Sequence, residues 1–176
     1  MRHAIVVVTV LAGCSHAADP AIDAPPSNPD APKAPDGPAP DAPPPGTPLR
    51  IIVLNEVAPG ENPDWIEVVN ATTAPVQLAD FVFVDKAGDL AKAVPFPQMM
   101  LSPGARFVQD VDGTIVPFKL GSDEEVWIYR ASDGALSDGV DWDEGAAPTG
   151  KSYARIPDVF GPFQTSEQTR GRANQP

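Results

Sequence analysis

The residue types that carry out most protein chemistry are unevenly distributed along this chain. Its 176 residues include two histidines and one cysteine, His3, His16 and Cys14. Residues 17–176 therefore offer neither imidazole nor thiol, which excludes Ser-His-Asp and Cys-His catalysis and zinc sites made of these ligands from that part. A single cysteine also excludes an internal disulfide. Carboxylates remain as candidates, because the chain has 24 acidic and 12 basic side chains and a formal net charge of −12.

Two short segments bring carboxylates together with other polar and aromatic side chains. Asn55 and Glu56 lie in one apolar run, and Trp65 and Glu67 lie in the next. These residues could form a ligand patch, but we favour a structural polar network between adjacent strands, because a buried carboxylate needs partners to offset its lost hydration. Arg155 is the expected partner for one of these carboxylates. We assign no catalytic residue and no cofactor, and carboxylate-based hydrolysis is the least favoured alternative.

A second group of carboxylates suggests calcium. Hard cations need several oxygens from one flexible loop, and Asp138, Asp141 and Asp143 are weak candidates for such a site. Their spacing does not follow the Asp-x-Asp-x-Asp-Gly register of a helical calcium loop, so solvated loop charge is the preferred interpretation. The acidic balance also argues against a protein that binds nucleic acid, because phosphate contacts require a basic face.

The first 13 residues have the organisation of an export signal. A positive start at Arg2 is followed by a largely apolar run of nine residues, 4–12, too short for the roughly 20 that a membrane-spanning helix requires. The run ends in Leu11-Ala12-Gly13-Cys14, which resembles the lipobox of bacterial lipoproteins. The resemblance implies cleavage after Gly13 and lipidation of Cys14, and the following Ser15 implies sorting to the outer membrane. An ordinary secretory signal and a buried strand are the alternatives.

Residues 14–48 are expected to form an acidic, disordered linker. Twelve prolines and no aromatic residue lie between Asp19 and Pro48, and the triplet Asp-Ala-Pro occurs three times. Proline fixes φ and removes a hydrogen-bond donor, so neither helix nor sheet can propagate through this segment. The composition favours polyproline II and indicates a stalk or spacer.

Residues 49–176 are predicted to be an all-β domain. All 12 aromatic residues of the chain lie here, and short apolar runs alternate with turns rich in Gly and Pro, as in a β-sandwich. We expect a hairpin turn at Asp133-Gly134. The expected core residues are Trp65, Ile66, Phe81, Phe107 and Trp127. The expected strands are 51–57, 65–70, 76–78 leading into 81–84, 106–109, a short one at 118–120, 126–129, and a last pair formed by 140–142 and 153–156.

The order of several motifs resembles the lamin tail domain family. They are Ile52-Val53-Leu54-Asn55-Glu56-Val57, Asp64-Trp65-Ile66-Glu67-Val68-Val69-Asn70, Val76-Gln77-Leu78-Ala79-Asp80-Phe81, Leu101-Ser102-Pro103-Gly104-Ala105-Arg106-Phe107-Val108, Ser152-Tyr153-Ala154-Arg155-Ile156-Pro157-Asp158 and Thr169-Arg170-Gly171-Arg172-Ala173-Asn174. The resemblance implies an immunoglobulin-like sandwich. Arg170 stands where the family usually has proline. In exported bacterial proteins such domains look like binding or targeting modules, often fused to hydrolases.

Together these features predict a lipid-anchored protein of the bacterial cell envelope. Its sandwich domain is expected to be a non-catalytic binding or scaffolding module, carried on the proline-rich stalk. The expected partners are the membrane, through Cys14, and an unknown protein or polysaccharide of the envelope, but not nucleic acid. A calcium-stabilised adhesion domain is the main alternative.

Overall fold

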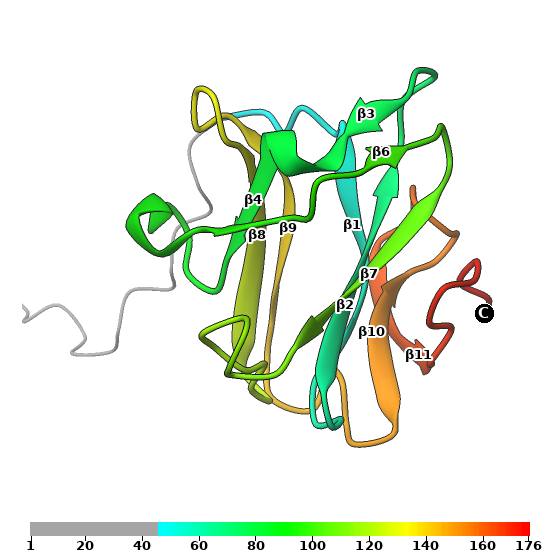
Figure 1. Ribbon diagram of the computed structural model, residues 1–176. Helices are drawn as coiled ribbons and strands as arrows, with labels where there is room; N and C mark the ends of the chain where they lie inside the picture. Colours follow the sequence, from blue (N-terminus) through cyan, green and yellow to red (C-terminus); the bar gives the residue numbers. More distant parts are fainter. Residues whose placement is uncertain (1–45) are drawn as a thin grey trace, which may run out of the picture. The chain divides into compact units, whose positions relative to one another are not determined.

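The computed structural model describes residues 46–176 (Figure 1). The expected signal peptide, Cys14 and the linker up to residue 45 lie outside the described residues. The described part is an all-β sandwich of antiparallel strands, which confirms the predicted fold class. Within residues 46–176, no helix has the length and apolar character needed to cross a membrane.

Two main sheets form the sandwich. The larger has the strand order β11-β10-β1-β2-β7, and the smaller has the order β5-β4-β8-β9. A short pair, β3 and β6, forms a third, two-stranded sheet. The strands are β1 Ile52–Ala58, β2 Asp64–Asn70, β3 Val76–Gln77, β4 Phe81–Val84, β5 Val94–Pro95, β6 Met100–Leu101, β7 Arg106–Val111, β8 Glu124–Arg130, β9 Leu136–Trp142, β10 Lys151–Arg155 and β11 Phe163–Glu167; two 3₁₀ turns are η1 Leu78–Asp80 and η2 Leu90–Lys92.

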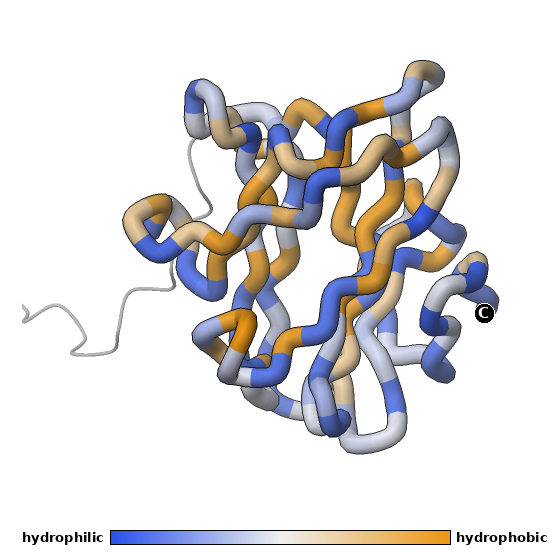
Figure 2. Tube along the Cα trace, in the orientation of Figure 1, coloured by the Kyte–Doolittle hydropathy of each residue, from blue (hydrophilic) through white to orange (hydrophobic). Residues whose placement is uncertain are grey.

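The main core lies between the two sheets, where the hydrophobic segments of Figure 2 run along the strands. Ile66 and Phe81 belong to this core and Phe107 packs against it, as expected. Trp65 is 1% exposed but lies on the outer face of the larger sheet, because side chains alternate along a strand and Ile66 faces inward. Trp127 packs in a separate cluster on the outer face of the smaller sheet.

A β-bulge in β1 interrupts the alternation of its side chains. The register of β1 against β2 skips Asn55. Leu54 and Val57 both belong to the core between the sheets, although they are three residues apart. An extra residue in one strand produces this pattern, because it shifts the side chains that follow to the opposite face. Consequently Asn55 and Glu56 both point to the outer face of the larger sheet.

A second bulge, in β9, ties the two sheets together at one edge. The register of β9 against β8 skips Ser137. The Ser137 hydroxyl accepts from the N–H of Ile52 at 3.0 Å and donates to its carbonyl at 2.8 Å. The carboxylate of Asp138 accepts from the N–H of Leu54 at 3.0 Å. Two consecutive polar side chains of β9 therefore satisfy backbone groups of β1.

Two strand expectations were wrong. Residues 118–120 form a loop, although Leu120 is buried and Phe118 packs against the core. The expected pairing of 140–142 with 153–156 does not form, because β10 lies between β1 and β11 in the larger sheet. Strand β11 was not among the expected strands, because its central residues Gln164, Thr165 and Ser166 carry no apolar alternation.

Candidate functional site

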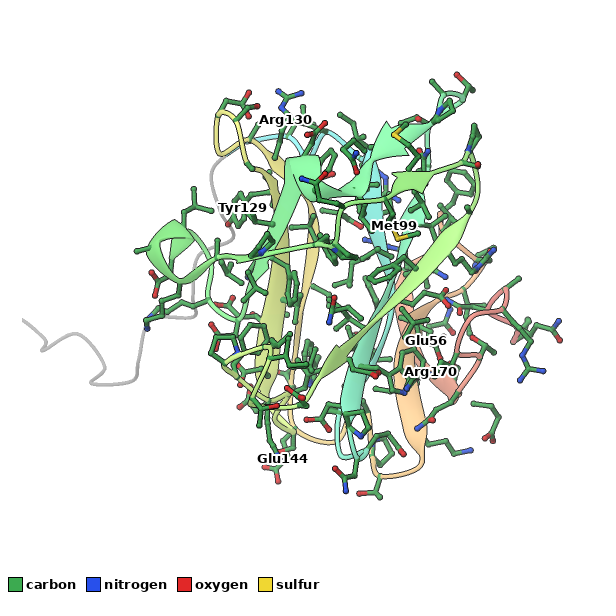
Figure 3. The ribbon with its side chains drawn as sticks, in the orientation of Figure 1. Glu56, Met99, Tyr129, Arg130, Glu144 and Arg170 are labelled. Carbon is green, nitrogen blue, oxygen red and sulfur yellow. The ribbon has the colours of Figure 1, made fainter. Side chains whose placement is uncertain are left out.

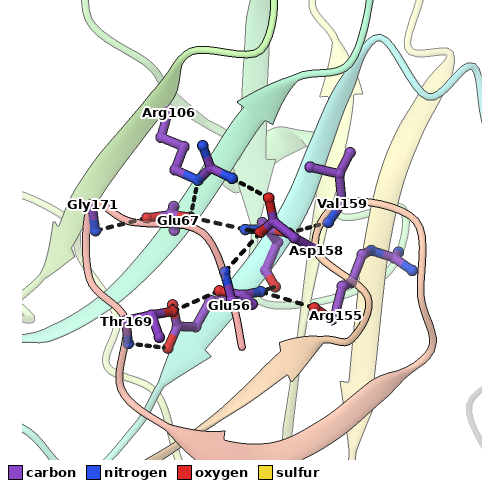
Figure 4. A network of polar contacts seen from close by, with 10 residues as sticks. Glu56, Glu67, Arg106, Arg155, Asp158, Val159, Thr169 and Gly171 are labelled. Atoms are coloured by element: carbon purple, nitrogen blue, oxygen red, sulfur yellow. Dashed lines mark hydrogen bonds and ion pairs between the residues drawn. The ribbon is translucent and has the colours of Figure 1, made fainter. Parts of the chain in front are cut away.

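The candidate site is a buried polar network on the outer face of the larger sheet (Figure 4). The bulge in β1 delivers Asn55 and Glu56 to this face, and Glu67 of β2 lies opposite Glu56. The side chains of all three residues are fully buried. These three residues were expected to belong to one structural network, and the structure brings them together.

Asn55 connects strand β2 to the loop between β10 and β11. Its side-chain N–H₂ donates to Oε1 of Glu67 at 2.9 Å and to Oδ1 of Asp158 at 3.0 Å. Its side-chain oxygen accepts from the N–H of Val159 at 2.9 Å. The amide thus uses both donor hydrogens and its acceptor, so it is fully satisfied in the absence of water.

Glu67 is surrounded by hydrogen-bond donors. The N–H of Gly171 donates to its Oε2 at 2.8 Å, and Nε of Arg106 lies 3.3 Å from its Oε1. Arg106 also forms an ion pair with Asp158. Burial raises the pKa of Glu67 from 4.5 to about 7, and the nearby Glu56 adds to this, while Asn55, Gly171 and Arg106 act in the opposite direction. Glu67 therefore changes its protonation close to neutral pH.

The C-terminal residues 168–174, which we call the C-terminal strap, cover the pair of glutamates. The N–H and hydroxyl of Thr169 donate to the carboxylate of Glu56 at 2.9 and 2.7 Å. The side-chain N–H₂ of Asn174 donates to the carbonyls of Asn55 and Arg155 at 2.9 and 3.1 Å. Figure 3 shows Glu56 on the same side of the molecule as the strap's Arg170. The strap is thus fixed to the sheet mainly by hydrogen bonds.

Arg155 is not the partner of Glu56 or Glu67, which corrects the expectation from the sequence. It donates to both oxygens of Asp138 at 3.0 and 2.9 Å and to the carbonyl of Leu54 at 2.8 Å. Strand alternation is the reason, because Arg155 shares with Tyr153 the face of β10 that packs on the core. Arg106 is the cation beside Glu67, and the sequence analysis assigned it no role.

The calcium candidates do not converge. Asp138 is 3% exposed and is held by Arg155 and by the N–H of Leu54. Asp141 is an exposed residue of β9, and Asp143 lies in the loop beyond this strand. Among the described residues, no group of three or more His, Cys, Asp or Glu side chains is arranged to hold a metal ion.

The network also supports a strained loop between β10 and β11. Val159 has φ +67°, a left-handed conformation that β-branched residues rarely adopt. Its N–H donates to Asn55, and its carbonyl accepts from Nη2 of Arg50 at 2.9 Å. The next residue, Phe160, is 79% exposed. A Cβ on Gly161 would lie 2.0 Å from the backbone of Ile156, so the chain can turn this tightly only with glycine.

Several members of the network had no role in the sequence analysis. They are Asp158, Thr169, Gly171 and Asn174, which were named there only as parts of the motifs that resemble the lamin tail family.

The chain was compared with family models, with curated proteins and with solved structures, and none of these comparisons found a match.

Proposed function

We propose that this chain is a lipid-anchored protein of the bacterial cell envelope whose sandwich domain is a non-catalytic, lamin-tail-like binding or scaffolding module. The stalk of residues 14–48 would carry the module, and lipid on Cys14 would hold it to the membrane. The observation that carries the binding role is the exposure of Phe160 on a rigidly braced loop.

The energetics of this loop support an interaction role. Burial of a phenylalanine side chain contributes about 1.5–3 kcal/mol to stability. Phe160 is largely exposed, so most of this stabilisation is absent in the isolated domain. The left-handed Val159 costs on the order of 1–3 kcal/mol more, which the bonds to Asn55 and Arg50 offset. Rigid aromatic side chains that project from a surface are typical anchors of binding interfaces, since little conformational entropy is lost when they are buried.

The buried carboxylates favour binding over catalysis in this proposal. Glu56 and Glu67 are fully buried, and their oxygens already accept hydrogen bonds from Thr169, Asn55 and Gly171. A general acid or nucleophile must contact its substrate, whereas these groups contact the protein itself. Their evident contribution is to fix the C-terminal strap and the Phe160 loop on the sheet.

Site-specific photo-crosslinking in the native cells tests the proposal. A photoreactive phenylalanine analogue at position 160 should give discrete adducts with an envelope protein or polysaccharide. The matched control is the same analogue at Ile115, which is 87% exposed on a different loop. Adducts at position 160 that are no stronger than those at position 115 would argue against this surface as the binding site.

A variant separates binding from folding. Phe160→Ala should leave the melting temperature almost unchanged, because the ring is largely solvated. It should also abolish association with the partner identified by crosslinking. If Phe160→Ala binds that partner as tightly as the unaltered protein does, the proposed anchor is wrong.

A further inference from the structure

The C-terminal strap closes over two carboxylates that face each other. Glu56 and Glu67 are opposite one another on β1 and β2, and neither is exposed. The strap contributes the donors that cover both: Thr169 binds Glu56, and the N–H of Gly171 binds Glu67 at 2.8 Å (Figure 4). Lifting the strap would return both carboxylates to water.

The charges around Glu67 do not balance. Three carboxylates lie in the network, from Glu56 on β1, Glu67 on β2 and Asp158 in the loop after β10. Arg106 of β7 is the cation beside Glu67 and Asp158. The other nearby cations have different partners: the Arg155 guanidinium is turned to Asp138, and the strap's Arg170 reaches Asp110 at 2.5 Å.

This imbalance makes closure of the strap sensitive to protons. Covering a charged carboxylate costs free energy unless a cation or a proton compensates it, and one guanidinium contacts two of the three carboxylates here. The pKa of Glu67 rises to about 7 because the closed structure buries it. In an open structure this carboxylate would regain water, and its pKa would fall back toward the ordinary 4.5.

The sign of the effect follows from linkage. The closed state has the higher pKa, so it binds the proton more tightly than the open state does. Closure is therefore strongest below the open-state pKa, near 4.5, weakens as the pH rises from there to about 7, and does not change further at higher pH.

We propose that the C-terminal strap is a pH-responsive cover, which stays docked on the Glu56–Glu67 pair in acidic solution and loosens as the pH rises toward neutral. Loosening would uncover an acidic strip on the outer face of the larger sheet. The same change would release Asn174, whose backbone N–H donates to Asp158 at 2.9 Å, and so relax the base of the Phe160 loop. This inference does not depend on the function proposed above.

Amide hydrogen exchange in the full chain, measured by NMR between pH 5.5 and 8.5, tests the cover. After correction for intrinsic exchange, protection of the Gly171 N–H should fall as the pH rises from 5.5 to about 7, by up to about tenfold per pH unit for one linked proton, and should level off above about 7. The N–H of Val68, inside the larger sheet, serves as the control and should show no such dependence. Constant protection of Gly171, or a loss of protection on acidification, would overturn the proposal.

Glu67→Gln removes the titrating group while keeping its shape. In this variant the protection of Gly171 should no longer change with pH, and a persisting change would overturn the proposal. Should the variant fail to fold, carboxyl ¹³C titration of Glu67 in the unaltered chain decides the matter. Its midpoint should coincide with the pH at which the fall in Gly171 protection levels off, and a clear separation of the two values would contradict the mechanism.

Discussion

The side-chain oxygen of Asn55 accepts a hydrogen bond from the N–H of Val159 at 2.9 Å, across 104 positions of sequence. This bond links the bulge of β1 to the strained loop that exposes Phe160. The same side chain donates to Glu67 and Asp158, so a single amide holds a strand, a loop and two carboxylates together. The conformation of the Phe160 loop thus depends on a residue deep in the sheet.

Replacing Asn55 with alanine should therefore be strongly destabilising. Two carboxylates would lose a donor and the Val159 N–H would lose its acceptor, and each buried group left unsatisfied costs about 1–3 kcal/mol. We expect a loss of about 3 kcal/mol in the free energy of unfolding, measured by urea denaturation. Gln109→Ala, at a side chain with an exposed hydrogen bond, is the control and should change stability by less than about 0.5 kcal/mol. An Asn55→Ala variant as stable as this control would contradict the role of the network.

At position 159, glycine should give a more stable protein than alanine, which reverses the usual order of these two residues. At φ +67° alanine retains the left-handed strain, whereas glycine does not; both variants lose the two methyl groups that pack against Val53 and Val69, and glycine loses only Cβ in addition. Val159→Gly should therefore be more stable than Val159→Ala by about 1 kcal/mol. At Ala154, in the buried strand β10, glycine should instead be less stable than alanine by about 0.5–1 kcal/mol. Thermal unfolding of the four proteins checks both signs.

The strands and the network glutamates could be predicted because their signals are local. The short runs of apolar, mostly β-branched residues in β1 and β2 predicted buried strands, and the polar residues within these runs indicated a buried network. The bulge also left a trace in the sequence, since Asn55 and Glu56 are consecutive polar residues between the inward-facing Leu54 and Val57. Because side chains alternate between the two faces of a strand, two polar residues between two inward-facing residues predict one extra residue, which is a β-bulge.

The partners within the network could not be predicted from the sequence. Whether Arg155 meets Glu67 or Asp138 depends on which face of β10 it occupies, and this is set by pairing with β1 about 100 residues away. The strand β11 had no apolar alternation to reveal it, because it lies at an edge and its central residues are polar. The partner of Arg155 and the formation of β11 both depend on which strands pair, which residue type alone does not reveal.

The N-terminal boundary of the domain can be tested by truncation. The N–H groups of Leu49 and Arg50 donate to the carbonyls of Leu136 and Ser137 at 2.9 and 2.8 Å, so these two residues belong to the fold. A fragment of residues 49–176 should melt cooperatively. A fragment that starts at Ile51 should be less stable by about 1–3 kcal/mol, because it also loses the Arg50 bond to the Val159 carbonyl. Equal stability of the two fragments would place the boundary later.

Lipidation can be tested at Cys14, the one cysteine of the chain. Cys14→Ala should abolish labelling with radioactive palmitate and release the protein from membranes, because each buried methylene of a lipid chain contributes about 0.8 kcal/mol to anchoring. Ser15→Ala, which keeps the thiol, should remain labelled and membrane-bound. Labelling that persists in Cys14→Ala would refute lipidation at this residue.

Trp127 lies where a side chain of Gly139 would be, and this pair should behave as a coupled unit. A Cβ on Gly139 would meet Cε3 and Cδ2 of the Trp127 ring at 2.2 and 2.8 Å, so Gly139→Ala should cost about 1–3 kcal/mol. Removing the ring in Trp127→Ala relieves most of this conflict, although the carbonyl of Val126, at 2.8 Å, remains close. The double variant should then be more stable than the sum of the single effects predicts, by at least about 0.5 kcal/mol. Gly121→Ala, where the nearest atoms would be at an ordinary 3.5 Å, provides the control in the same denaturation series. Additive effects of the two changes would show that the ring does not rest on the glycine, and would remove the reason for glycine at this position.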